Sequence, residues 1–156
     1  VSQEGYDKGV RILHFLGGMH IEINAHRAIG QTKMTITQRG MVDGVLCDVV
    51  CTGRFYDFIE KRPVAPKEGP GKGDEWRITW RRLIYEKDRL DPINPAETVK
   101  LDPALLAEFP IGYRHLAYLQ TRIGYKVKTD MAGLVGPDVD KLYALGKTWL
   151  DGGKVL

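Results

Sequence analysis

Residues 12–23 read ILHFLGGMHIEI and predict the strand on which the rest of the fold depends. Successive side chains of a strand point to opposite faces, so His14 shares one face with Ile12 and Leu16. Apolar residues normally fill such a face, and a glycine pair inside a strand, here Gly17–Gly18, usually marks a bulge or bend. Because strongly bent sheets wrap around cavities, we expect the imidazole of His14 to line one.

The composition is that of one globular domain. The chain has 156 residues, of which 43% are hydrophobic and 28% are charged, and this is enough to bury a core. The formal net charge is +3, with acidic residues interspersed among basic ones along the whole chain. This pattern predicts a solvated surface and no nucleic-acid partner. The chain contains no apolar run long enough to span a membrane, so we expect no membrane partner either.

The two cysteines, Cys47 and Cys51, lie four residues apart in one predicted strand. They point to the same side at a separation of roughly 13 Å, which is too far for a disulfide. Without a disulfide framework or a secretory signal, we predict a reducing, cytoplasmic location.

Apolar residues recur every second position in the first half of the chain and at helical spacing after Lys87. The predicted antiparallel strands cover residues 12–23, 28–39, 45–61 and 75–87, and the third strand bends at Gly53. The predicted helices cover residues 103–109 and 113–123, and a last one begins at Pro137. We therefore predict an α+β fold, with a curved antiparallel sheet in residues 1–88 and a helical extension in residues 89–156 packed on the same domain.

One acid, Asp57, falls among apolar residues on a face of the third predicted strand. Burying an unpaired carboxylate costs several kcal/mol, so a cation should lie beside it. Strand alternation in residues 75–87 places Arg82 on the face with Trp80, and we predict Arg82 as the partner of Asp57.

Short motifs follow one another between residues 10 and 88. They are HFLGG at residues 14–18, IG at 29–30, GRFYDFIEK at 53–61, WRI at 76–78, and RR at 81–82 followed by Tyr85. Their order and spacing resemble the SnoaL-like, scytalone-dehydratase-like branch of the NTF2-like superfamily. The segment after Lys87 looks like a C-terminal extension found in some members.

This resemblance implies a cone-shaped α+β fold whose sheet wraps an apolar pocket closed by N-terminal helices, and frequent homodimers. Similar proteins include dehydratases, isomerases and cyclases that act on small cyclic, aromatic or polyketide-like molecules, usually without a cofactor. The histidine that matches His14 takes part in proton transfer there, whereas a second histidine falls near Gln38 here. The N-terminal helices have no counterpart in this chain. Either the sequence is a fragment of a longer protein, or another chain supplies the missing layer, or the cavity is open and inactive.

We predict that His14 is the general acid/base of a cofactor-independent lyase or isomerase, because the pKa of imidazole lies near neutrality. The alternative for His14 is a core histidine bonded to the backbone. Asp57 is the second catalytic candidate, since a carboxylate can orient an imidazole, but we favour the structural ion pair with Arg82.

Aromatic and polar side chains of the predicted strands are candidates for substrate binding, although aromatic residues at strand spacing more often belong to the core. The candidates are Gln38, Met34, Phe55, Trp80, Arg82 and Tyr85. No histidine has a second ligand at metal-binding spacing, so we predict no metal site and no cofactor. The rival function is a non-catalytic NTF2-like module that binds a ligand or dimerises.

Overall fold

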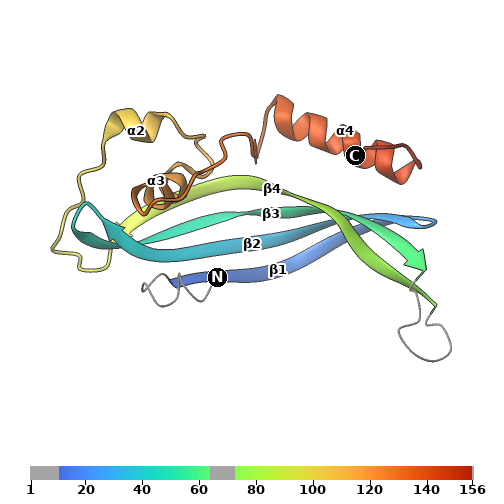
Figure 1. Cartoon of the computed structure of the whole chain (residues 1–156), viewed down its shortest axis with the longest axis horizontal. Helices are drawn as coiled ribbons and strands as arrows, with labels where there is room; N and C mark the ends of the chain where they lie inside the picture. Colours follow the sequence, from blue (N-terminus) through green and yellow to red (C-terminus); the bar gives the residue numbers. More distant parts are fainter. Residues whose placement is uncertain (1–10, 64–72, 156) are drawn as a thin grey trace.

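The computed structural model describes residues 11–63 and 73–155, which form an α+β fold with a curved, unclosed sheet (Figure 1). The strands are β1 (Arg11–Asn24), β2 (Arg27–Val42), β3 (Val45–Pro63), β4 (Asp74–Pro92) and β5 (Ala132–Gly133). The helices are α2 (Pro103–Ala107), α3 (Arg114–Arg122) and α4 (Pro137–Leu150). Residues 1–10 and 64–72 of the predicted sheet region lie outside the described residues.

The sheet has the strand order β1-β2-β3-β4-β5, and its four long strands pair antiparallel with their neighbours in sequence. The predicted α+β class and antiparallel meander are thus confirmed. Sequence analysis did not find β5, a two-residue strand that pairs parallel with Ile84 and Tyr85 of β4. The sheet is therefore mixed.

A tight turn fixes the register of the central hairpin. Asp43 and Gly44 join β2 to β3 with φ angles of 48° and 86°. A two-residue hairpin turn of this hand requires positive φ at both positions, which Asp and Gly tolerate. The pairing of β2 with β3 then continues without a shift from Val42↔Val45 to Arg27↔Glu60.

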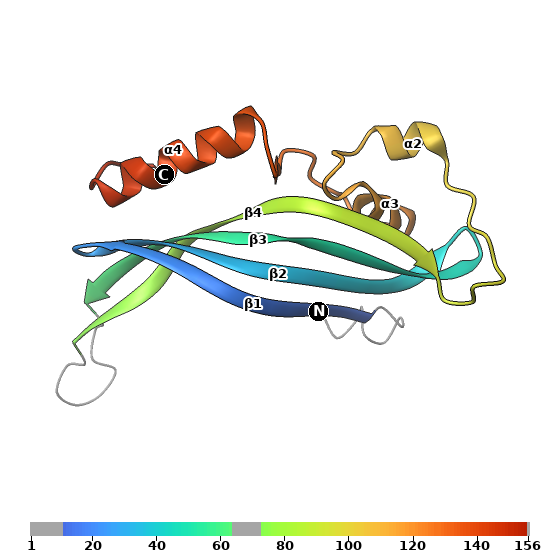
Figure 2. The same cartoon turned by 180° about the vertical axis from the view of Figure 1, so that it is seen from behind.

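The sheet twists so strongly that its two ends turn opposite faces toward the helices. In Figures 1 and 2 the order of the strands from top to bottom reverses between the two ends, while α3 and α4 lie on the same side of the molecule. Met34 and Ile36 of β2 belong to the core under α3, whereas Ile29 belongs to the core under α4. Even and odd positions of a regular strand lie on opposite faces. We call the face that carries Met34 and Ile36 the α3 face, and the face that carries Ile29 the α4 face.

Helices α2 and α3 cover one end of the α3 face. Tyr118 and Leu119 of α3 are fully buried there against Cys47, Val49 and Cys51 of β3, among other residues. The hydroxyl of Tyr118 donates to Asp43 at 3.2 Å and accepts from the backbone N–H of Asp102 at 3.0 Å. This one side chain therefore ties the β2–β3 turn to the start of α2.

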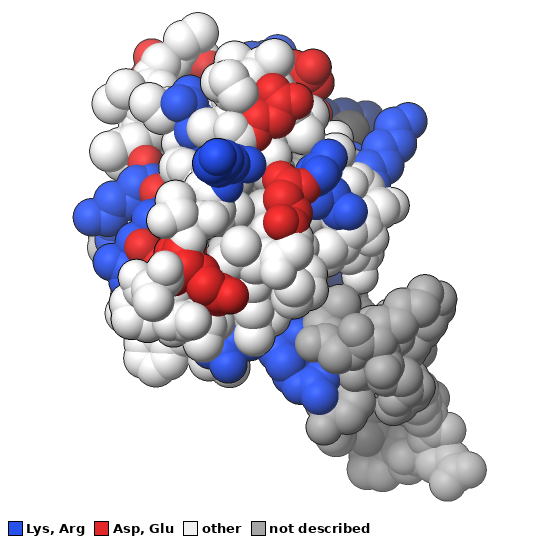
Figure 3. Space-filling model, turned by 90° about the vertical axis from the view of Figure 1, so that its left-hand side faces the viewer, with Lys and Arg blue, Asp and Glu red and all other residues white. Residues whose placement is uncertain are grey.

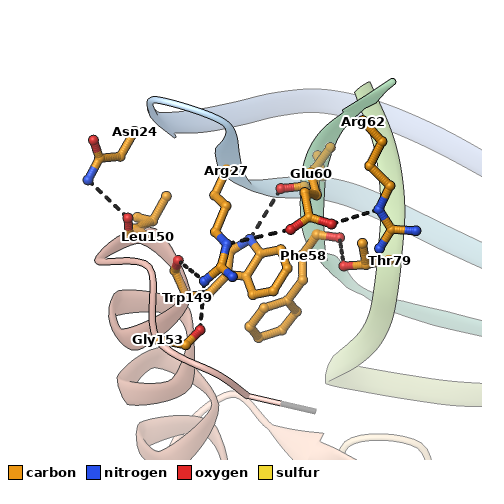
Figure 4. Close-up of polar contacts among 10 residues, drawn as sticks. Asn24, Arg27, Phe58, Glu60, Arg62, Thr79, Trp149, Leu150 and Gly153 are labelled. Carbon is orange, nitrogen blue, oxygen red and sulfur yellow. Dashed lines mark hydrogen bonds and ion pairs between the residues drawn. The ribbon is translucent and has the colours of Figure 1, made fainter. Parts of the chain in front are cut away.

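Helix α4 is fixed to the other end of the sheet by Arg27, at the start of β2 (Figure 4). The guanidinium of Arg27 donates to the carbonyl oxygens of Trp149 at 3.1 Å and Gly153 at 2.6 Å. These carbonyls lie at the C-terminal end of α4, where the helix dipole favours a cation. The same guanidinium lies 4.0 Å from the centroid of the Trp149 ring and 3.7 Å from Glu60.

Helices α2 and α4 begin where the sequence predicted. The side chain of Asp102 caps α2 by accepting from the backbone N–H groups of Ala104 and Leu105, and Pro137 opens α4. Helix α3 runs from residue 114 to 122, one residue shorter at each end than the predicted segment. In the described part of the chain, no helix is both long enough and apolar enough to cross a membrane.

Three register shifts bend the long strands. One lies in β1 between Leu16 and Met19, and two lie in the β3–β4 pairing, at Thr52/Gly53 and at Phe58/Ile59. The shifts at the glycines of β1 and at Gly53 fall where bends were predicted. A Cβ atom added to Gly53 would lie 2.3 Å from the carbonyl oxygen of Ile84, whereas one added to Gly18 would meet nothing within 4 Å.

We expect Gly53→Ala to lower the free energy of unfolding by about 1–3 kcal/mol, because the clash is with backbone and no side-chain rotation relieves it. Gly18→Ala is the matched control and should change the free energy of unfolding by less than about 0.5 kcal/mol. Urea unfolding followed by circular dichroism measures both. Equal losses in the two variants would contradict the close contact at Gly53.

Candidate functional site

Asp57 is a fully buried carboxylate on the α3 face of β3. Arg81 lies directly opposite on β4 and donates from Nε to Oδ1 at 2.6 Å and from Nη2 to Oδ2 at 2.7 Å. This two-pronged geometry is the strongest form of such a pair, and the hydrogen bond to Asp57 raises the pKa of Arg81. The guanidinium also lies 4.1 Å from the centroid of the Phe55 ring. The pair thus compensates a charge that burial would otherwise make costly.

The prediction that Arg82 pairs with Asp57 is wrong. The register shift between Phe58 and Ile59 interrupts the alternation of β4, so Arg81 comes to face Asp57. Arg82 instead lies opposite Tyr56 on the α4 face. The structural ion pair that we favoured for Asp57 therefore exists, but with the neighbouring arginine.

Beyond the reach of α3, the α3 face of the sheet is apolar and exposed. We call this region the open surface and define it by five side chains that are 46–60% exposed: Leu16, Met19, Ile21 and Ile23 of β1, and Ile78 of β4. The Asp57–Arg81 pair joins β3 to β4 on the same face. Thr32 of β2 is also buried there, and its hydroxyl has no hydrogen-bond partner among the residues that the structure describes. The open surface thus combines an apolar area with a small number of polar groups.

His14 lies on β1 opposite Ile36, on the α3 face, as the alternation predicted. It is exposed, so within the described residues it does not line an enclosed cavity, and the alternative of a core histidine is wrong. The structure shows no hydrogen bond or ion pair of its side chain with any described residue.

His14 and Asp57 are too far apart in one chain for the carboxylate to orient the imidazole. His14 pairs with Ile36 and Asp57 pairs with Gly30, six residues further along β2. At about 3.3 Å per residue this separates them by roughly 20 Å along the strands. The predicted catalytic contact between them is therefore wrong within a single chain.

Four of the predicted substrate-binding residues lie on the α3 face. Gln38 and Met34 are buried in the core under α3. Tyr85 stacks on Tyr113 of the adjoining segment, with ring centroids 4.4 Å apart. Phe55, half-buried next to the guanidinium of Arg81, is the candidate that borders the open surface.

The other two candidates, Trp80 and Arg82, lie on the α4 face. The ring of Trp80 lies 4.8 Å from that of Phe58, centroid to centroid, in the core under α4. The guanidinium of Arg82 lies 5.5 Å from the Trp80 centroid. The structure therefore does not bring these two side chains to the open surface.

Both cysteines are buried and free, which confirms that they do not bridge each other. Burial raises the pKa of Cys51 to about 12. Its thiol therefore stays protonated at neutral pH, and a protonated thiol is a poor nucleophile.

Sequence reasoning missed one carboxylate–imidazole pair. Asp88 of β4 lies 2.8 Å from Nδ1 of His115, and its other oxygen accepts from the backbone N–H groups of His115 and Leu116 at 2.7 and 2.9 Å. Asp88 thus caps the N-terminal turn of α3 from a strand 26 residues upstream. No local pattern could indicate such a distant cap, and its bonds to the backbone point to a structural role.

A hollow of about 210 Å³ lies beside the Gly17 bend, lined among others by Phe15, Lys33, Thr52 and Glu86. Lys33 approaches Glu86 at 2.9 Å, and Arg54 does so at 3.0 Å. The acid at this hollow is therefore already neutralised by two cations.

The described residues contain no group of three or more histidine, cysteine, aspartate or glutamate side chains arranged to hold a metal ion. Figure 3 shows one end of the molecule, where basic and acidic side chains are interspersed. No continuous patch of one sign appears on that side.

We expect Arg81→Met to lower the free energy of unfolding by about 3 kcal/mol, because it leaves the carboxylate of Asp57 buried and unpaired. A loss of about 3 kcal/mol is at the low end of the usual range for breaking a buried ion pair. We choose the low end because the side chain of Arg81 is 41% exposed and water can partly replace it. Arg82→Met is the matched control and should cost less than about 1 kcal/mol. Chemical unfolding of both variants tests the pairing, and a larger loss for Arg82→Met would overturn it.

No protein-family model matches the chain, but curated fungal proteins do. An uncharacterized protein of Emericella nidulans is 39% identical over 99% of this chain and 67% of its own length. A PEP2-like protein of Fusarium vanettenii is 40% identical, and pea pathogenicity protein 2 of the same fungus is 37% identical, each over 99% of this chain and 66% of its own length. This chain therefore spans about two thirds of the length of these relatives. The chain belongs to the same family as the Emericella nidulans protein, a family whose sequence likeness extends to the PEP2-like proteins.

Proposed function

We propose that this chain is an NTF2-like module whose open surface binds a small, largely apolar molecule. The observation that carries the proposal is the Asp57–Arg81 pair, a rigid polar anchor set into an apolar sheet face. Ligand sites are mostly apolar and contain a few well-placed polar groups that fix the orientation of the ligand. The open surface has this composition.

The shape of the sheet between β1 and β3 supports the same proposal. Gly30 has no side chain, and a Cβ atom there would lie 3.2 Å from Ile59 and 3.7 Å from Ile21. The side chains of Ile59 and Ile21 therefore pack over Gly30 and form the apolar surroundings of Asp57, which pairs with Gly30 across the strands. Arg81, being 41% exposed, keeps N–H groups that can reach a hydroxyl or carbonyl oxygen of a ligand.

The likeness of residues 14–85 to SnoaL-like sequences favours a ligand of the small cyclic, aromatic or polyketide-like class. The two free, buried thiols agree with a reducing compartment, and on this ground we place the protein in the cytoplasm as part of the proposal.

We expect 2-naphthol, a small aromatic alcohol, to bind saturably, and Ile21→Asp to weaken its binding about fivefold or more by placing a charge on the apolar floor. Leu13→Asp is the control, because Leu13 lies on the opposite face of the same strand and is 64% exposed. Fluorescence titration measures the dissociation constants. Binding that does not saturate, or equal losses in both variants, would contradict the proposal.

A second candidate function is the cofactor-independent dehydratase or isomerase. The exposed imidazole of His14 on the α3 face, which bonds to none of the described residues, favours it. In this reaction the imidazole takes a proton from the carbon next to a ketone. The imidazolium then gives this proton to the hydroxyl on the next carbon, the bond between that carbon and oxygen breaks, water leaves, and a double bond conjugated with the ketone forms. An exposed imidazole without a competing partner is free to accept that proton.

We expect His14→Gln to reduce dehydration of a hydroxylated cyclic ketone by about 10²-fold or more, the usual contribution of a general acid/base. His20→Gln is the control, since His20 lies past the bend on the other face. The absorbance of the new conjugated double bond measures turnover. Activity within a few-fold of the parent chain would remove His14 from the reaction but would leave ligand binding at the open surface intact.

A further inference from the structure

β1 is an edge strand, and its outer side is unpaired among the described residues. Six large apolar side chains on its two faces are 46–67% exposed: Leu13, Phe15, Leu16, Met19, Ile21 and Ile23. From residue 12 to 21 the strand contains no lysine, arginine, aspartate, glutamate or proline. Edge strands normally carry such residues, because an apolar, uncharged edge pairs with other chains.

The opposite edge of the sheet is protected in the usual way. β5 covers β4 at Ile84 and Tyr85, and β4 carries charged residues along its length, including Arg77, Arg81 and Glu86. The contrast between the two edges indicates that a partner pairs with β1 but not with β4.

We propose that β1 pairs antiparallel with β1 of a second copy of this chain, so that the two sheets join into one. The pairing is symmetric about the Gly17–Gly18 bend, with Gly17 of one copy facing the partner's Gly18. In this register every residue of β1 faces a residue of the partner strand. Arg11 faces the partner's Asn24 at one end, and Asn24 faces the partner's Arg11 at the other.

Side chains that face each other in this register lie on the same face of the joined sheet. The bend shifts the alternation, so Ile12 and Leu16 precede it on the α3 face and Met19 and Ile23 follow it there. Leu16 then packs against the partner's Met19, and Ile12 against the partner's Ile23. These two contacts on the α3 face are apolar, and apolar cross-strand pairs stabilise antiparallel strands.

The paired strands would supply about half of the residues of a standard interface. Pairing two 14-residue strands gives about a dozen interchain backbone hydrogen bonds. Specific interfaces contain about 20–30 residues a side, and β1 alone supplies 14 of them. The contact is isologous and uses up both β1 edges, so assembly stops at two copies.

The dimer would also complete the ligand-binding face. Ile21, Gly30, Asp57 and Arg81 form one row across the four strands of a chain. In the proposed register, the partner's His14 extends this row beside Ile21. Its ring would then lie about 14 Å, three strand spacings, from Asp57, with Ile21 and Gly30 between them.

Sedimentation velocity from low to high micromolar concentration tests the pairing. We expect the parent chain to be a dimer. Leu16→Glu and Met19→Lys should each weaken the dimer by about tenfold or more, which is about 1.4 kcal/mol. The double variant with both changes should recover the dimer, because each glutamate then faces a lysine of the partner. Leu16 and Met19 are 52% and 55% exposed, so neither change disturbs the core.

Ile78→Lys is the matched control, since Ile78 is 51% exposed on the same face but on β4, and this variant should remain a dimer. In addition, Leu16→Cys chains mixed with Met19→Cys chains should form a disulfide that neither variant forms alone, and the buried native thiols should not interfere.

Three outcomes would overturn the proposal. They are a parent chain that stays monomeric at every concentration, assemblies that grow beyond two copies, and a double variant no more dimeric than the single ones. None of these outcomes bears on ligand binding by the single chain, so the two proposals can fail separately.

Discussion

The register of β3 against β4 decides which side chains share a face, and the site depends on it. At the hairpin end Ile59 faces Ile78, and continuing that register would place Trp80 opposite Asp57. The shift between Phe58 and Ile59 puts Arg81 there instead, so a buried carboxylate gains a two-pronged partner rather than an aromatic ring. The same shift sends Trp80 to the α4 face, where it packs in the core under α4. One irregularity therefore provides both an ion pair and a core residue.

The twist of the long strands explains why half of each face is left uncovered. Helices α3 and α4 lie on the same side of the molecule in Figure 1, but the sheet has turned over between them, so each covers the opposite face. The uncovered half of the α4 face mixes charged and threonine side chains such as Lys33 and Thr35 with the exposed side chains of Leu13 and Phe15. The uncovered half of the α3 face carries isoleucine, leucine and methionine. The second also holds the Asp57–Arg81 pair, and for this reason we place the ligand there.

The elements of this fold could be predicted from the sequence because their signals are local. Period-two alternation, the Asp102 cap and the glycine bends all act within a few residues, and the structure agrees with each. The site could not be predicted to the same extent. No glycine marks the shift near Ile59, so Arg82 was chosen over Arg81, and the link of Asp88 to α3 spans 26 residues. The exposure of His14 depends on what covers the sheet, which alternation in one strand does not reveal.

The bend at Gly17–Gly18 explains how a strand with charges near one end presents an apolar edge. With unbroken alternation, His20 and Glu22 would join His14 on the α3 face, and Met19 and Ile21 would lie on the other. The shift exchanges these two sets, so His20 and Glu22 lie on the α4 face, as does Asn24, which donates to the carbonyl of Leu150 in α4. The α3 face of β1 is therefore apolar on both sides of the bend, apart from His14. On this face Ile12 and Leu16 stand at the same distances from the bend as Ile23 and Met19, which suits an antiparallel contact with an identical strand.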